Sequence, residues 1–150
     1  MRLNISASDL HELPTELEKR LDLLAEHILL DQNKDRLRVN LKLVSSKEMI
    51  ELNKEFREKD LDTNVLSFPA SNEIQKISDE LGDIAMSIPY IQNESQNLNR
   101  DLEDHMMHLL AHGILHLLGF DHKEDQDANM MEAQEIKYLK FFKIANPYLI

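Results

Sequence analysis

Apolar and polar residues alternate in four short stretches of the chain, a pattern typical of strands with one buried face. The first stretch covers residues 3–7 and the second covers residues 37–43. A charged loop then runs into the third, which ends at Pro69 because proline cannot donate a ladder hydrogen bond. The fourth is expected at residues 81–87. We interpret residues 72–80, between the last two strands, as a mobile polar loop.

Elsewhere, apolar residues recur every three or four positions, which predicts amphipathic helices. Ser45 or Ser46 can cap one of them, and Pro89 can open another. The predicted helices lie at about residues 13–30, from Ser46 to Phe56, from Pro89 toward Leu98, from near Asn99 or Arg100 through a run of histidines, and from after Asp127 to Phe142.

This order of elements predicts an α+β fold in which a four-stranded mixed sheet is covered by about five helices. The 150 residues contain no repeat and no internal boundary, so we expect a single domain over residues 1–150. There is no cysteine, which excludes disulfides and thiol catalysis and fits a reducing compartment. With no leader-like apolar segment near the start, we expect a soluble cytoplasmic protein without membrane contact.

The net charge of −11 argues against broad affinity for nucleic acid. The charge is uneven, however. Residues 34–59 carry eight basic and five acidic side chains, whereas the rest of the chain carries nine and 23. A basic region of this kind can steer a polyanion locally if it lines the functional cleft, although a solvated surface explains the same charges equally well.

The most informative stretch is residues 110–122, in which His112, His116 and His122 stand at relative positions 0, 4 and 10. Two residues four apart lie on one face of a helix, so the first two imidazoles can approach one ion. Gly119 can end the helix in a left-handed turn that returns the chain and delivers the third imidazole. Three imidazoles with an open fourth position make a catalytic rather than a structural zinc site.

Seven histidines placed at random would produce this spacing on the order of 0.015 times in such a chain. We therefore expect one metal ion at the end of the histidine-bearing helix. Zn2+ is the expected ion, although three imidazoles also suit Ni2+, copper or iron. His105 and His108 share the same helical face, and we expect them to support the ligands or to face solvent.

In zinc proteases with this ligand spacing, a glutamate general base follows the first histidine. Here that residue is Gly113, so a peptidase would lack its usual proton acceptor. Asp121 can orient a ligand or accept a proton, and it can equally serve only to form a turn. The residues alone indicate a metal-dependent hydrolase, with phosphodiester cleavage slightly favoured over peptide cleavage.

Arg57 is the candidate for contact with an oxyanion or a phosphate. Its planar guanidinium stays charged and can grip two oxygens at once, whereas an ion pair with a neighbouring glutamate is the alternative. We therefore name Arg57 and Asp121 as catalytic candidates beside the three predicted ligands.

Three segments of the chain together resemble the YbeY family of bacterial rRNA maturation factors. They are His112-Gly-Ile-Leu-His116-Leu-Leu-Gly119-Phe-Asp121-His122, Arg57 with Thr63-Asn64-Val65-Leu66-Ser67-Phe68-Pro69, and Leu81-Gly82-Asp83-Ile84. The resemblance implies a single-strand-specific, metal-dependent endoribonuclease that acts in 16S rRNA 3′-end maturation and ribosome quality control. It also implies a zinc-type site at His112, His116 and His122 and an important arginine at Arg57.

The same resemblance implies single-stranded rRNA and ribosomal or small-subunit proteins as partners. Many members of the family have aspartate where this chain has Asn64. An amide cannot act as a base, so Asn64 is not among the catalytic candidates. The alternative from another class is a non-catalytic ribosome assembly factor in which the metal mainly stabilises the last two helices.

Overall fold

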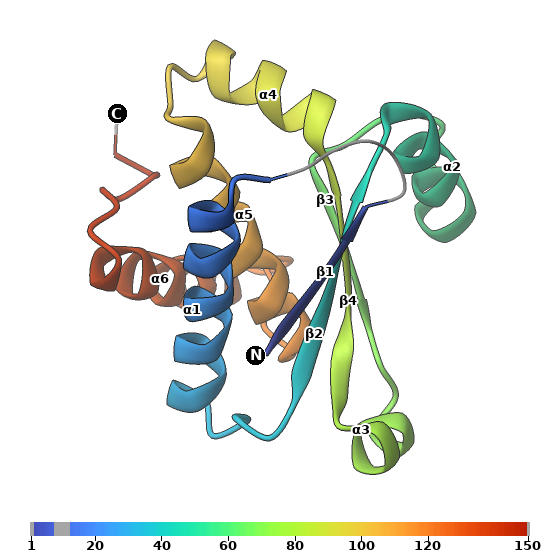
Figure 1. The fold of residues 1–150 in the computed structure, drawn as a ribbon, viewed down its shortest axis with the longest axis vertical. Helices are drawn as coiled ribbons and strands as arrows, with labels where there is room; N and C mark the ends of the chain where they lie inside the picture. Colours follow the sequence, from blue (N-terminus) through green and yellow to red (C-terminus); the bar gives the residue numbers. More distant parts are fainter. Residues whose placement is uncertain (1, 8–12, 150) are drawn as a thin grey trace.

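The protein is built around one twisted sheet with helices on both sides (Figure 1). The structure, a computed structural model, describes residues 2–7 and 13–149. The strands are β1 (Leu3–Ala7), β2 (Arg38–Val44), β3 (Val65–Pro69) and β4 (Glu80–Ser87). The helices are α1 (Thr15–Asp31), α2 (Ser46–Arg57), α3 (Asn72–Ser78), α4 (Ile88–Asn97), α5 (Leu102–Leu117) and α6 (Asp125–Phe141).

The strand order is β1-β2-β4-β3, in which β1, β2 and β4 run parallel and β3 pairs antiparallel with β4. Parallel neighbours need a crossover, and α1 supplies it between β1 and β2. Along β2, Val39, Leu41 and Leu43 are buried while Arg38 and Lys42 are exposed. The alternation gives the sheet one strongly apolar face, on which the helical layer packs.

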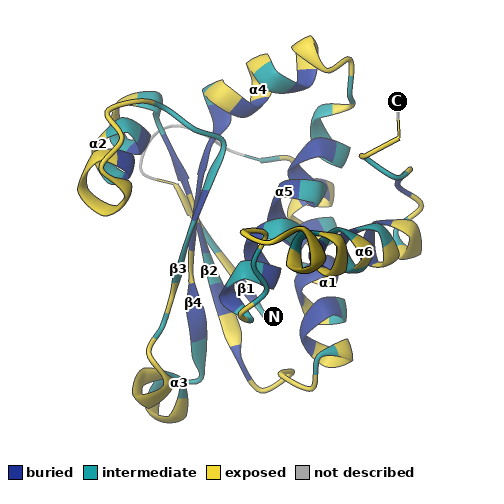
Figure 2. Ribbon diagram, turned by 180° about the vertical axis from the view of Figure 1, so that it is seen from behind, coloured by how far each residue is buried: buried dark blue, intermediate teal, exposed yellow. Residues whose placement is uncertain are grey.

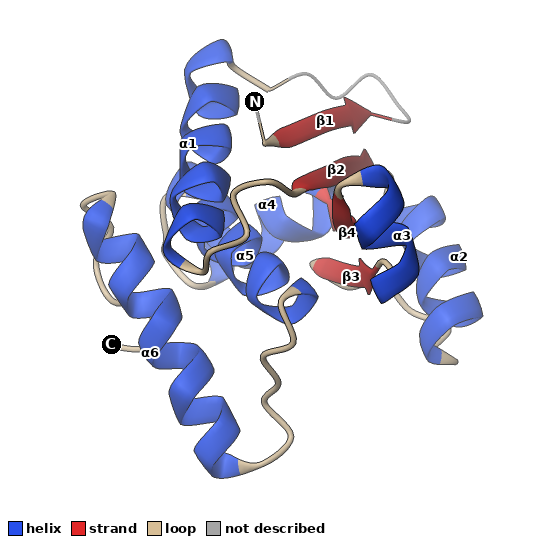
Figure 3. Ribbon diagram, turned by 90° about the horizontal axis from the view of Figure 1, so that it is seen from below, coloured by secondary structure: helices blue, strands red, loops and turns tan. Residues whose placement is uncertain are grey.

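The helices form two unequal layers (Figure 3). Helices α1 and α5 cover the apolar face, and α6 packs outside them. On the other face, α2 covers a small second core in which its Met49 contacts Val44, Leu66 and Ala85. Buried residues are concentrated where α1 and α5 face the sheet, whereas α2 and α3 present largely exposed surfaces (Figure 2).

Helix α5 is the centre of the helical layer. Ten of its 16 residues are buried because it contacts α1, α4, α6 and two strands. Fully buried side chains such as Leu110 and Ile114 each contribute about 1.5–3 kcal/mol to folding, so α5 is held firmly. Despite this apolar character, none of the helices in the described residues has both the length and the apolarity to cross a membrane.

The predicted α+β class and the four-stranded mixed sheet are confirmed. The prediction of a mobile loop at residues 72–80 is wrong, because Asn72–Ser78 form α3, a sixth helix. Its cap is formed by Ser71, whose side chain accepts a hydrogen bond from the Ile74 backbone N–H at 3.2 Å. Its only apolar residues, Ile74 and Ile77, are exposed, so the apolar pattern there is too short to predict a helix.

The start of α5 also differs slightly from the prediction. The helix begins at Leu102, and Asp101 is its N-cap rather than a residue of its first turn. The Asp101 carboxylate accepts a hydrogen bond from the Asp104 backbone N–H at 3.1 Å. This shift leaves the placement of the later histidines on α5 unchanged.

We expect Gly82→Ala to destabilise the protein by about 1–3 kcal/mol, because β4 passes close to β3 and α5 at this residue. A Cβ at Gly82 would lie 2.6 Å from the Phe68 carbonyl oxygen and 2.8 Å from Leu117 Cδ2. Urea unfolding of the metal-free protein measures the loss. Gly119→Ala is the comparison, since a Cβ there meets nothing within 4 Å and only its backbone conformation opposes the change. A loss no larger than that of Gly119→Ala would contradict the crowding at Gly82.

Candidate metal centre

Three histidines at the end of α5 and in the following loop bring their ring nitrogens together. His112 and His116 lie one turn apart on α5. The chain leaves the helix through Gly119, whose φ of +101° is in the left-handed region, and returns His122 to the same place. One nitrogen from each ring lies within 4.8 Å of the other two, and the Nε2 atoms of His112 and His116 are 3.1 Å apart. The three residues that the sequence predicts as ligands are thus able to hold one metal ion.

The protonation of the cluster also suits a metal. Burial lowers the pKa of His116, and the neighbouring His112 and His122 lower it further. Neutral imidazole is the form that binds a metal ion, because the ion needs the nitrogen lone pair. His116 therefore offers a donor atom at neutral pH.

The three histidines line a cleft of about 570 Å³. Because His112 and His116 are half-buried and His122 is exposed, a bound ion would remain accessible from the cleft. The polar residues that share the cleft with the histidines come from α2, from β3 and the residue before it, from the loop after α5, and from the C-terminal segment. They are Arg57, Asn64, Ser67, Asp121, Lys123 and Tyr148, and His108 of α5 lines the cleft with them.

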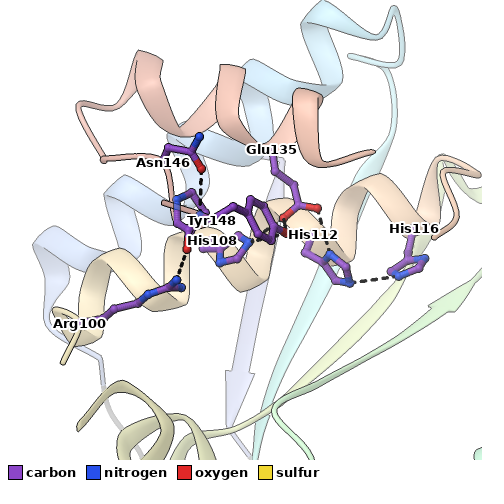
Figure 4. Close-up of polar contacts among 8 residues, drawn as sticks. Arg100, His108, His112, His116, Glu135, Asn146 and Tyr148 are labelled. Atoms are coloured by element: carbon purple, nitrogen blue, oxygen red, sulfur yellow. Dashed lines mark hydrogen bonds and ion pairs between the residues drawn. The ribbon is translucent and has the colours of Figure 1, made fainter. Parts of the chain in front are cut away.

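Behind the ligands, a buried carboxylate from α6 joins two histidines of α5 (Figure 4). Glu135 contacts His112 Nδ1 through Oε2 at 3.2 Å and His108 Nε2 through Oε1 at 2.6 Å. The Tyr148 hydroxyl also donates to Oε1 at 2.7 Å. Burial would raise the pKa of Glu135, but the hydrogen bonds from His108, His112 and Tyr148 outweigh it and lower the pKa from 4.5 to about 2. The carboxylate is therefore ionised at neutral pH.

Gly113 faces the sheet, where there is little room for a side chain. A Cβ there would lie 2.9 Å from Ile84 Cδ1 and 3.2 Å from Ser67 Oγ. The Ser67 hydroxyl also donates a hydrogen bond to the Gly113 carbonyl at 3.2 Å, which ties β3 to α5. Close packing of α5 against β3 and β4 explains why this position carries no glutamate.

Arg57 lies at the end of α2 and lines the cleft. Its Nη2 donates to the Ser67 carbonyl at 2.9 Å, its Nη1 donates to the Phe56 carbonyl at 3.0 Å, and its guanidinium lies 5.5 Å from the centre of the Phe68 ring. These contacts hold an exposed guanidinium toward the cleft. No carboxylate of the described residues forms an ion pair with it, so the alternative of a surface ion pair does not apply to residues 2–7 and 13–149.

Asp121 also lines the cleft. Its Oδ1 accepts a hydrogen bond from the backbone N–H of His122 at 2.7 Å, which is the geometry of an aspartate that shapes a turn. Its second oxygen makes no hydrogen bond with the described residues. Asp121 thus helps to place His122 and keeps one oxygen for another partner.

Comparison with known proteins assigns this arrangement to a family. A sequence model described as "Endoribonuclease YbeY" matches residues 4–143. The chain belongs to the YbeY family. Proteins named Endoribonuclease YbeY from Francisella tularensis subsp. tularensis (strain SCHU S4) and subsp. novicida (strain U112) are 39% and 38% identical to it. The matches cover 99% of this chain and 90% and 93% of those two proteins.

A solved structure supports the same fold. The solution structure of a Thermotoga maritima protein matches 92% of this chain and 87% of that chain, with a TM-score of 0.66 and 31% sequence identity. The resemblance to the YbeY family that the sequence motifs indicate is therefore confirmed over nearly the whole chain.

In this member of the YbeY family, His105 is buried, whereas His108 is partly exposed and lines the cleft. His105 is 3% exposed and contacts Glu94 Oε1 through Nε2 at 2.7 Å. Glu94 also accepts a hydrogen bond from the Asn64 amide at 3.0 Å. Of the two predicted alternatives, exposure to solvent does not apply to His105, and support of the ligands fits His108, which shares Glu135 with His112.

Glu135 and Tyr148 are not among the site residues predicted from the sequence. A signal for Glu135 is present, because it falls on the buried stripe of α6 with Met131 and Leu139, where a charged residue is out of place. Tyr148 carries no comparable signal, since it lies beyond the last helix and only the folded chain brings it to His108.

The basic region at residues 34–59 contributes little to the cleft. Of its eight basic side chains, only Arg57 lines it. The hypothesis that residues 34–59 line the functional cleft therefore holds for Arg57 and for none of the region's other basic side chains. Lys123, in the loop after α5, is the other basic side chain at this cleft.

We expect Gly113→Glu to destabilise the protein by about 2 kcal/mol or more without creating peptidase activity, because the new side chain must displace Ile84 and bury a carboxylate. Gly113→Ala is the matched control. Its smaller overpacking is partly offset by the better helix propensity of alanine, by about 1 kcal/mol. Thermal unfolding and a casein assay check both variants, and a stable Gly113→Glu protein that hydrolyses casein would contradict the explanation.

Proposed function

We propose that this protein is a metal-dependent endoribonuclease that cleaves single-stranded RNA at the cleft beside His112, His116 and His122. The observation that carries the proposal is that three converging imidazoles and the guanidinium of Arg57 line one cleft. Membership of the YbeY family supports the endoribonuclease activity. The geometry supports a bound metal, which we propose to be one Zn2+ or a related ion such as Ni2+.

The metal, when bound, supplies a Lewis acid for phosphodiester hydrolysis. Arg57 would bind the non-bridging oxygens of the scissile phosphate and stabilise the charge that develops there. Its backbone contacts to Ser67 and Phe56 fix the guanidinium before substrate arrives, so little ordering is needed on binding. The free oxygen of Asp121 would accept a proton at the edge of the cleft.

The charge of the protein sets limits on how it binds RNA. With a net charge of −11, attraction to phosphates must come from the cleft itself, where Arg57 and Lys123 are the basic side chains. Few phosphate contacts mean a shallow salt dependence and weak binding of long duplexes. A cleft with two basic side chains favours a single strand whose backbone can bend toward the metal.

We further propose that the physiological substrate is the 3′ end of 16S rRNA in the cytoplasm, in the context of ribosome quality control and contact with small-subunit proteins. This step rests on family membership. The alternative is a non-catalytic assembly factor whose metal mainly stabilises α5 and α6. The acidic net charge favours that alternative, and the cleavage assay below separates the two.

Purified protein should cleave a labelled single-stranded rRNA fragment, and chelation of the metal should stop the cleavage. His116→Ala should lose metal and reduce cleavage by more than about 100-fold, since even partners of metal ligands contribute 10–100-fold. His27→Ala is the control, because His27 stacks on Phe141 away from the cluster. Cleavage that persists in His116→Ala would reveal a contaminating nuclease and favour the assembly factor.

Arg57→Ala should lower kcat/KM for RNA cleavage by about 10²–10³-fold, as expected for loss of one oxyanion contact. Arg57→Lys keeps the charge but loses the planar fork, so it should fall between wild type and Arg57→Ala. Lys54→Ala removes the same charge from the same helix but from outside the cleft, and we expect it to cleave within about twofold of wild type. Equal losses for Arg57→Ala and Lys54→Ala would indicate general charge rather than a specific contact.

A further inference from the structure

The carboxylate of Glu135 is unusually placed for a residue with a structural role only. It is 0% exposed and lies on the stripe of α6 that also carries Met131 and Leu139. An apolar side chain would pack in this stripe without the cost of burying a charge. Packing of α6 therefore does not explain why this position carries a glutamate.

One partner of Glu135, His112, belongs to the metal cluster, and the other two, His108 and Tyr148, lie on the side away from His116 (Figure 4). Oε2 of Glu135 contacts His112 Nδ1 at 3.2 Å, and its Oε1 contacts His108 Nε2 at 2.6 Å and the Tyr148 hydroxyl at 2.7 Å. A carboxylate only accepts hydrogen bonds, so each of these groups donates to it. The proton of a neutral His112 ring is thereby assigned to Nδ1.

This assignment fixes what the opposite edge of the ring can do. With the proton on Nδ1, His112 Nε2 carries a lone pair, and Nε2 is the atom that lies 3.1 Å from His116 Nε2. In that tautomer the lone pair of Nε2 lies on the side where the three ligand nitrogens converge. Rotation of the His112 ring by half a turn would break the hydrogen bond to Glu135 and move Nε2, the atom that would bind the metal, away from the cluster.

The C-terminal segment holds the other side of the carboxylate. The Arg100 side chain donates to the Pro147 carbonyl, and the Tyr148 N–H donates to Asn146 Oδ1 at 2.9 Å. These contacts place the Tyr148 hydroxyl on Oε1 and set its ring against His108, with 5.5 Å between ring centres. The two oxygens of Glu135 therefore have different partners. Oε2 accepts a hydrogen bond from His112, and Oε1 accepts hydrogen bonds from His108 and Tyr148.

We propose that Glu135 is a positioning residue for the metal centre, which selects the Nδ1–H tautomer of His112 and orients its Nε2 toward the ion. The proposal rests on the metal site of the proposed function. A carboxylate behind a metal-bound histidine fixes the ring and increases its basicity, and loss of such a partner typically weakens metal binding 10–100-fold.

The test is the zinc affinity of the folded protein, measured by competition with a chromophoric chelator. Glu135→Met removes both acceptors and suits the apolar stripe, and it should bind zinc at least about 10-fold more weakly while keeping the circular dichroism and unfolding transition of a folded protein. Glu135→Gln keeps one acceptor oxygen and should lie between Glu135→Met and wild type.

Glu132→Gln is the matched control. Glu132 lies three residues earlier on α6 and makes no hydrogen bond with a histidine among the described residues, so its removal changes the charge and leaves the network intact. It should bind zinc like wild type. A Glu135→Met protein whose zinc affinity is less than about 10-fold weaker than that of wild type would overturn the proposal.

A second measurement uses the wild-type chain and does not depend on a variant that folds. Long-range 1H–15N NMR spectra of the metal-free protein should show the His112 proton on Nδ1, and a proton on Nε2 would overturn the assignment. The outcomes also separate this proposal from the proposed function. Failure of the wild type to bind zinc or cleave RNA counts against the function, whereas equal zinc binding by wild type and Glu135→Met counts against the role of Glu135 alone.

Discussion

Close contact between α5 and the sheet is the constraint on which the rest of the structure depends. Two glycines permit it from opposite sides. A Cβ on Gly82 of β4 would meet Leu117 of α5, and a Cβ on Gly113 of α5 would meet Ile84 of β4. Because the two elements approach so closely, the Ser67 hydroxyl of β3 reaches the Gly113 carbonyl. The strand that carries the contacts of Arg57 is thereby brought beside the helix that carries the histidines.

The same contact changes the chemistry that a familiar ligand spacing can support. The spacing of the three histidines is that of zinc proteases, in which the residue after the first ligand supplies the general base. In this chain that position faces Ile84 and is occupied by glycine. Close packing of α5 against the sheet leaves no room there for the glutamate of the proteases. The groups that line the cleft include a guanidinium at a helix end and an aspartate in a loop, which suits charge stabilisation at a phosphate better than attack on a peptide.

The parts of the fold and site that could be predicted from sequence are those determined by local pattern. Strand alternation gave the sheet, and a spacing of four plus a glycine indicated the histidine cluster. Helix α3 could not be predicted from periodicity, because its short span buries no side chain and only the Ser71 cap marks it.

Glu135 and Tyr148 depend on tertiary packing instead. Glu135 lies 23 residues from His112 in the sequence, and Tyr148 lies 40 residues from His108. Each contacts its histidine only because α6 or the C-terminal segment packs against α5. The positions of the basic side chains of residues 34–59 relative to the cleft could not be predicted for a related reason. Charge along the chain says nothing about which strand face or helix face each side chain takes.

The contact between Arg57 and Ser67 has a consequence for solubility as well. Strand β3 lies at the edge of the sheet, where unpaired backbone groups can recruit a strand from another molecule. Arg57 occupies the Ser67 carbonyl, and Pro69 has no N–H to offer at the end of the strand. The side chain proposed to bind phosphate therefore also leaves one backbone acceptor fewer on this edge for a strand of another molecule.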